Sequence, residues 1–275
     1  MSPEAKIINH WGKGGLVDAV LAALEAAGLD PDNLTPDDLA PLDHLHGRGS
    51  EATAELMEIL APGPDTHLID IGSGIGGPSR LAAHTYGARV TGIDLTGEFC
   101  DVADMLNRRM GLSDRVTIRQ ASALDLPFDD ESFDGAFSQN VSMNIEDKEA
   151  FYAEAFRVVR PGGLFVAAEY AEGPGGAPVF PVPWALEPEN SHLLKPDDLR
   201  RTVEAAGFEI VDFIDQTEAM LESYQRAREK LAVEGPPVLS PRVLLGEDGA
   251  ERLRNSALST EQKRTIPVQL VCRRG

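Results

Sequence analysis

A short apolar run that leads into a glycine-rich turn constrains the fold of this chain most strongly. Residues 67–71 (His-Leu-Ile-Asp-Ile) precede residues 72–77 (Gly-Ser-Gly-Ile-Gly-Gly), and a second apolar run over 89–93 ends in Asp94. Glycine permits a tight turn and lets a ligand come close to the backbone. An acidic residue at the end of the next strand can accept hydrogen bonds from ribose hydroxyls. The pattern predicts a nucleoside-bearing ligand at the edge of a parallel sheet.

The residue before the turn indicates which ligand this is. Gly72, Gly74 and Gly77 also fit the G-x-G-x-x-G spacing of dinucleotide sites, which alone is a weak signal. Asp70, however, precedes the first glycine by two residues, and a carboxylate there suits a cationic ligand better than a pyrophosphate. S-adenosylmethionine (SAM) carries a sulfonium and an ammonium group and no phosphate. The order D-x-G-x-G and then strand-Asp resembles the first two motifs of the class I SAM-dependent methyltransferases.

Two further motifs extend this resemblance over about residues 65–215. Residues 123–134 resemble the family's loop beside the adenine and the start of its fourth strand, and residues 157–163 (Arg-Val-Val-Arg-Pro-Gly-Gly) resemble its helix-turn-strand signature. Proline and glycine in that signature end a helix and begin a strand. Within the family, the chain most resembles the sarcosine/dimethylglycine and phosphoethanolamine N-methyltransferases.

The alternation of strands and helices predicts an α/β protein with a Rossmann-like, doubly wound sheet. Strands are expected near 67–71, 89–93, 115–119, 134–139, 163–169, 208–214 and 266–272, and helices near 78–86, 97–110, 147–158 and 196–206. Such alternation favours a mostly parallel sheet that is covered on both faces. The resemblance implies seven strands with an antiparallel last strand, and Pro267 favours a strand start or an edge position there.

The chain is expected to divide into an N-terminal helical cap segment, 1–64, and a SAM-binding domain, 65–275. Thr35 is expected to start one cap helix and Ser50 to cap another. Long connections near 171–195 and 216–264 leave the predicted sheet at the carboxyl ends of its strands, where ligands bind in such folds. Loops of this length in a compact domain are often functional. We therefore expect these insertions to complete a helical cap over the cofactor.

The resemblance implies a set of cofactor contacts. Asp94 should bind the ribose, although it could instead cap the helix that starts near Gly97, and Leu95 should pack on the adenine. Relatives commonly carry an acid just before the residue that corresponds to Ala123, whereas this chain has Ser122. The adenine is then held by Ser122 or by the main chain alone. The expected SAM-binding residues are Asp70, Gly72, Ser73, Gly74, Asp94, Leu95, Ser122, Ala123, Leu124 and Gln139.

The acceptor is expected beside the end of the fourth strand. Asn144 lies in a stretch where some relatives carry a catalytic His; an Asn cannot act as a base near neutral pH, but it can orient an acceptor or cap the helix near Asp147. His46 is the second catalytic candidate, for contact with the methionine carboxylate or with the acceptor. Trp184, in a proline-rich segment, and Tyr170 are the candidate substrate contacts. Their rings could face a cationic substrate or pack as a loop core.

The amino-acid composition argues against some classes of binding partner. The chain has 25 Lys and Arg against 45 Asp and Glu, a formal net charge of −20, which argues against binding to nucleic acid or to an anionic membrane. Its two cysteines and six histidines show no metal-ligand spacing, so no metal is expected. The sequence also shows no signal peptide and no long apolar run, which predicts a cytoplasmic protein.

These patterns predict transfer of the SAM methyl group to a small-molecule acceptor. Because no strong base motif is evident, an amine nitrogen is favoured as the acceptor atom. Two alternatives stay open: a C-methyltransferase of the quinone or sterol type, and a SAM-binding protein without catalytic activity. An NAD-dependent oxidoreductase is a further alternative only if Asp70 and the Pro-Gly-Gly signature occur in this sequence by chance.

Overall fold

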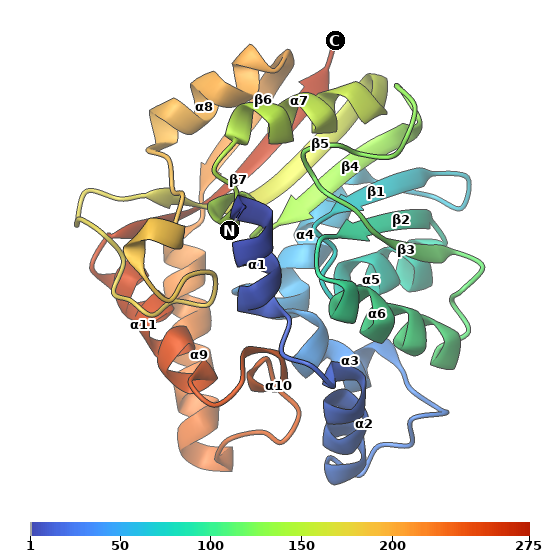
Figure 1. The fold of residues 1–275 in the computed structure, drawn as a ribbon, viewed down its shortest axis with the longest axis vertical. Coiled ribbons are helices and arrows are strands. Elements are labelled where there is room, and N and C mark those ends of the chain that lie inside the picture. Colours follow the sequence, from blue (N-terminus) through green and yellow to red (C-terminus); the bar gives the residue numbers. More distant parts are fainter. Residues whose placement is uncertain (1) are drawn as a thin grey trace.

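The computed structural model describes residues 2–275 and is built around one seven-stranded sheet (Figure 1). The strand order is β3-β2-β1-β4-β5-β7-β6. All neighbouring strands are parallel except that β7 runs antiparallel to both β5 and β6. The predicted Rossmann-like sheet with one antiparallel last strand is therefore confirmed.

The strands are β1 (His67–Ile71), β2 (Arg89–Asp94), β3 (Val116–Gln120), β4 (Phe133–Gln139), β5 (Val159–Glu172), β6 (Phe208–Asp215) and β7 (Thr265–Arg274). The helices are α1 (Pro3–Trp11), α2 (Leu16–Ala26), α3 (Pro36–Asp43), α4 (Gly49–Leu60), α5 (Gly77–Tyr86), α6 (Gly97–Arg109), α7 (Lys148–Val158), α8 (Pro196–Ala205), α9 (Thr217–Glu234), α10 (Arg242–Leu245) and α11 (Gly249–Glu261). Short 3₁₀ turns lie at Ser142–Asn144 and Pro188–Asn190.

Alternate residues of β1 pack on opposite faces of the sheet, as in a strand that is buried on both sides. Leu68 packs in a cluster with residues of α4 and α5. Ile69 and Ile71 pack in a second cluster with residues of α7 and α8. Helices therefore cover both faces, and the carboxyl ends of the parallel strands are left free for a ligand.

Several local expectations need correction. Ser50 does not cap α4, because the helix begins at Gly49 and the N-cap residue is Arg48 with φ 66°. Pro267 lies near the start of β7, as expected, but β7 pairs on both sides and is no edge strand. Thr35, by contrast, starts α3 as predicted, through reciprocal hydrogen bonds with Asp38.

A buried ion pair holds the N-terminal segment against the sheet's helices. The Arg80 guanidinium in α5 donates to both carboxylate oxygens of Asp43 at the end of α3 and, at 3.1 Å, to Asn107 of α6. Gly77 allows this contact, because a Cβ there would lie 2.2 Å from the Asp43 carbonyl oxygen. The loop after Asp43 is thus fixed beneath the carboxyl end of the sheet.

Helix α1 crosses that same end of the molecule, between α6 on one side and α9 and α11 on the other (Figure 1). It contains no buried residue. Its side-chain contacts include those of His10 Nε2, 2.7 Å from the Pro183 carbonyl oxygen, and of Trp11, whose Nε1 donates to Asn144 Oδ1 at 3.2 Å and whose ring packs on Phe99. None of the helices within residues 2–275 has the length and hydropathy that crossing a membrane requires.

Candidate active site

A cavity of about 1330 Å³ opens at the carboxyl ends of β1, β2 and β4. The chain segments expected to form the cap also line it: the N-terminal segment through residues 3–49, the connection after β5 through Pro183 and Trp184, and the connection after β6 through residues 223–257. All of the predicted site residues contribute to its wall, namely His46, Asp70, Gly72, Ser73, Gly74, Asp94, Leu95, Ser122, Ala123, Leu124, Gln139, Asn144, Tyr170 and Trp184. The residues predicted from separate sequence patterns therefore lie around one cavity. The role of each residue stays a prediction.

The glycine turn after β1 has the geometry that its sequence predicts. Gly72 and Gly74 have φ values of 81° and 54°, which side-chain-bearing residues rarely adopt. A Cβ on Gly72 would lie 2.3 Å from Val141 Cγ2, whereas a Cβ on Gly74 would meet nothing within 4 Å. Gly72 therefore allows close packing against Val141, and the backbone at Gly74 is open to a ligand.

Asp94 is held in place by the backbone of the same turn. One carboxylate oxygen accepts from Gly74 N at 2.9 Å, and the other accepts from Thr96 N at 2.8 Å. Burial raises the pKa of this carboxyl, against the opposing effect of those hydrogen bonds. The alternative role as helix cap is wrong, because Thr96 is the N-cap residue of α6. Asp94 is thus oriented by two N–H groups and retains free lone pairs toward the cavity.

Asp70 lies deeper, at the end of β1. Its carboxylate accepts a hydrogen bond from Ser79 Oγ at 2.7 Å. Burial raises its pKa to about 7, and the nearby Asp94 adds to the rise, while the Ser79 hydrogen bond opposes it. A cation in the cavity would favour the ionised form, so the charge of Asp70 is available to a positively charged ligand near neutral pH.

The loop expected beside the adenine is shaped by Ser122. Its Oγ accepts from Leu124 N at 3.0 Å, which closes a tight local turn. The side chains of Ala123 and Leu124 pack on the core beneath the α7 face of the sheet. The Ser122 hydroxyl keeps its proton for a further acceptor.

Three residues that line the cavity each have a buried side-chain polar atom with no partner within residues 2–275, namely Gln139 Nε2, Ser73 Oγ and Arg48 Nε. The other amide atom of Gln139, Oε1, accepts from Thr53 Oγ1 at 3.0 Å. Unsatisfied buried polar groups are costly and uncommon, so each needs an explanation. A polar ligand that reaches Gln139 and Ser73 supplies one, and the amino-acid end of SAM fits this donor set.

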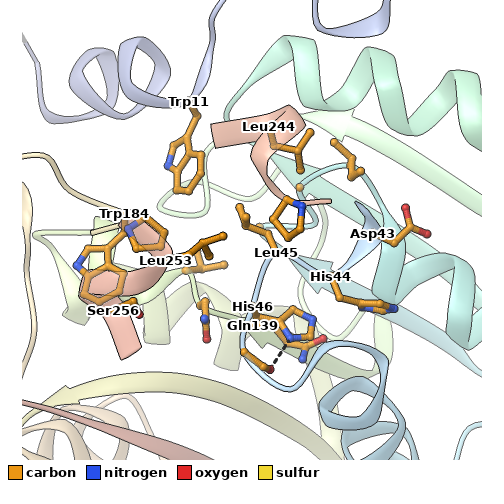
Figure 2. A pocket seen from close by; sticks show the side chains of 18 of the residues that line it. Trp11, Asp43, His44, Leu45, His46, Gln139, Trp184, Leu244, Leu253 and Ser256 are labelled. Atoms are coloured by element: carbon orange, nitrogen blue, oxygen red, sulfur yellow. Dashed lines mark hydrogen bonds between the residues drawn. The ribbon is translucent and has the colours of Figure 1, made fainter. Parts of the chain in front are cut away.

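His44 and His46 lie beside Gln139 at one side of the cavity (Figure 2). Both rings approach Thr53 Oγ1 at 3.3 Å, and His46 Nδ1 also lies 3.2 Å from the Gly47 carbonyl oxygen. Burial lowers the pKa of His44 to about 3 and that of His46 to about 4. Both imidazoles are therefore neutral near pH 7, and His46 is a weak proton acceptor.

The Asn144 amide already has two partners. Oδ1 accepts from Trp11 Nε1, and Nδ2 donates to the Val141 carbonyl at 3.1 Å. Its alternative role as a helix cap is wrong, because Asp147 caps α7 by accepting from Ala150 N. Asn144 therefore joins α1 to the loop after β4, and contact with an acceptor would require these bonds to change.

An aromatic wall faces the other side of the cavity. Trp184 stacks on Tyr170 with ring centroids 5.2 Å apart. The Trp184 indole N–H donates to Ser191 Oγ, and the Tyr170 hydroxyl lies 2.9 Å from that of Tyr224. Both rings are 5% exposed and pack in one buried cluster with Met143 and Met220, so only a small, apolar part of each reaches the cavity.

Sequence reasoning did not identify Trp11, Thr53 or Arg48 as site residues. Ser2 and Pro3 have the pattern of a helix start, and Ser2 Oγ does accept from Ala5 N, so α1 could have been predicted. Its position across the cavity could not. Thr53 and Arg48 belong to the N-terminal part of α4, where no motif distinguishes them from ordinary helix residues.

Comparison with known proteins agrees with this geometry. Residues 69–167 match the methyltransferase domain family. A sarcosine/dimethylglycine N-methyltransferase of Halorhodospira halochloris is 31% identical over 187 residues, which cover 66% of this chain and 66% of that protein. The chain thus spans just under two thirds of that relative's length.

Two solved structures share the fold. Haemonchus contortus phosphoethanolamine N-methyltransferase 2, in complex with phosphomonomethylethanolamine and S-adenosylhomocysteine (SAH), has a TM-score of 0.74 at 19% identity and covers 98% of this chain and 60% of that one. Geranyl diphosphate C-methyltransferase from Streptomyces coelicolor has a TM-score of 0.71 at 20% identity over 100% and 99% of the two chains. The chain thus contains a methyltransferase domain over residues 69–167 and shares its fold with two solved methyltransferases.

Proposed function

We propose that this protein binds SAM at the edge formed by β1, β2 and β4 and transfers its methyl group to a small molecule held under the cap. The observation that carries the proposal is the Asp94 carboxylate, fixed by Gly74 N and Thr96 N and facing the cavity beside the open glycine turn. Asp94 would bind the ribose, Ser122 and the main chain of 123–124 the adenine, and Gln139 and Ser73 the amino-acid end.

The chemistry requires little from the protein beyond placement. When bound, SAM supplies an activated methyl group on a sulfonium. The cavity walls would align the acceptor and exclude water. Since burial keeps His46 neutral with a pKa of about 4, it serves as a positioning or weak proton-accepting group. A nucleophile that needs no strong base therefore suits this site, and an amine nitrogen is our first proposal for the methylated atom.

A carbon acceptor is the second candidate, and the aromatic wall favours it. An alkene that attacks the methyl group leaves a positive charge on the substrate, which the ring faces of Trp184 and Tyr170 can stabilise. The geranyl diphosphate C-methyltransferase has the same fold. The two candidates differ in product, because N-methylation leaves the carbon skeleton unchanged and C-methylation extends it.

Two measurements test the proposal. Calorimetric titration with SAM, SAH and NAD should show binding of the first two alone. An SAH-release assay over amines, phenols and isoprenoid alkenes, with mass spectrometry of the products, then identifies the acceptor atom. Binding of NAD without SAM would contradict the proposed cofactor, and SAH binding without turnover on any acceptor would favour a non-catalytic SAM-binding protein.

A further inference from the structure

The cavity has an acidic end at the sheet edge and a basic end at the cap, and Glu4, Arg48, Glu146 and Asp147 also line it. Asp70 and Asp94 lie at the sheet edge. The cap helices α9 to α11 and the segments that join them contribute one acid, Glu234, and four basic residues to the cavity wall. The basic residues are Arg228, Lys230, Arg242 and Arg254. All four basic residues are exposed, and in a chain with a net charge of −20 they gather on one wall of the cavity.

Two of these cations have no partner. Arg228 pairs with Glu261, and Lys230 lies 3.8 Å from Glu234. The side chains of Arg242, at the start of α10, and Arg254, in α11, form no ion pair or hydrogen bond within residues 2–275. Arginine presents a planar set of donors that matches carboxylate and phosphate oxygens. These two guanidinium groups are therefore free for an anion at the cap end.

Between the two ends the cavity is apolar and large. Trp11 and Leu244 lie on one side of it, and Leu253 and Trp184 on another (Figure 2). Ligand pockets commonly measure about 300–1,000 Å³, so a volume of about 1330 Å³ leaves room for a sizeable molecule beside a nucleoside cofactor. A small amino acid would leave most of this apolar surface without a contact.

We propose that the methyl acceptor is an apolar molecule that carries a carboxylate or phosphate group, and that Arg242 and Arg254 bind this anionic group at the cap end. This inference rests on the proposed function, since it assumes that the cationic cofactor takes the acidic end. The arginines would orient the acceptor, so that its reactive atom points away from the cap and toward the sheet edge.

Probe displacement tests the proposal without knowledge of the acceptor. The neutral apolar dye N-phenyl-1-naphthylamine is bound to the SAH-loaded protein and displaced, below micelle concentrations, by dodecanoate, dodecyl phosphate, dodecanol or dodecylammonium. We expect one or both anions to displace the dye about tenfold better than dodecanol, and dodecylammonium to be the weakest competitor. The two anions distinguish a carboxylate from a phosphate ligand.

Variants locate the effect. The double variant Arg242→Gln/Arg254→Gln should lose the advantage of the anion while its affinities for the dye and for dodecanol stay unchanged. Arg273→Gln is the matched control, because Arg273 is exposed and pairs in register with Leu164 at the far end of β5. No anion preference in the unmodified protein, a preference that survives in the double variant, or failure of the dye to bind would each overturn the proposal.

The cofactor assumption is tested separately. SAH titration of the same samples reports on the sheet edge alone, and the displacement series is repeated without SAH. Loss of SAH binding refutes the proposed function, whereas loss of anion preference with intact SAH binding refutes only the assignment of Arg242 and Arg254.

Discussion

Asp94→Ala is the most direct test of the cofactor site. In the structure the carboxylate accepts from Gly74 N at 2.9 Å and from Thr96 N at 2.8 Å. Under the proposed function it also accepts hydrogen bonds from the ribose hydroxyls. Alanine removes the ribose contact and leaves the two turn N–H groups without their acceptor, so the variant should bind SAM and SAH more weakly but keep the sheet.

The size of the effect follows from the charge on the acceptor. Hydrogen bonds to charged groups contribute about 1.5–3 kcal/mol, and each 1.4 kcal/mol is about tenfold in affinity. The Kd for SAH should therefore rise about 10- to 150-fold. Asp125→Ala is the matched control, because Asp125 is an exposed acid in the loop after Ser122 and does not line the cavity.

Isothermal titration with SAH measures the affinity, and circular dichroism confirms that each variant is folded. An unchanged Kd in folded Asp94→Ala would remove Asp94 from the cofactor site. An equal loss in Asp125→Ala would instead show that the effect is not specific to the position of Asp94.

Four further outcomes test the rest of the site. Gly74→Val should abolish SAH binding in a titration while the sheet stays formed by circular dichroism, since the new side chain projects into the cavity; normal binding would refute the role of the glycine turn. SAM affinity should rise between about pH 5.5 and 7.5 as Asp70, with a pKa of about 7, ionises beside a cation; Asp70→Asn should remove that rise, and a fall with pH would contradict the assignment. Trp184→Ala should impair methyl transfer far more than SAH affinity, and hydrogen exchange should slow on SAH binding in 171–195, 216–264 and the N-terminal segment; an exchange pattern independent of SAH would make the cap purely structural.

The proposed cofactor half of the cavity could be predicted because the residues that form it are close together in the sequence. Strand, glycine turn and second strand lie within residues 67–94, and their dihedral angles and spacing determine where Asp94 meets the turn. The carboxyl ends of parallel strands share one edge of the sheet, so the loops that begin at Ser122 and Gln139 could be placed there from sequence order alone.

The acceptor half could not be predicted, because it depends on contacts between distant segments. The Trp11 contact with Asn144 joins residues 133 positions apart, and the His10 contact with Pro183 joins residues 173 apart. A single sequence shows Asn144 as a polar residue near the methyl position. Only the packing of α1 shows that both of its amide atoms are already engaged.

The proposed cofactor half and acceptor half of the cavity also differ in the kind of groups that form them. The cofactor end is built from backbone N–H groups, glycines and a few short side chains, which tolerate little change. The cap end is built from side chains of α1, α9, α10 and α11 that meet only in the folded protein, and its free arginines oppose the overall negative charge. Because the acidic end would suit a cationic cofactor and the basic end an anionic acceptor, the two ligands would each meet charges of opposite sign. We therefore expect acceptor specificity to follow the charge and volume of the cap end, and cofactor affinity to be unaffected by its substitutions.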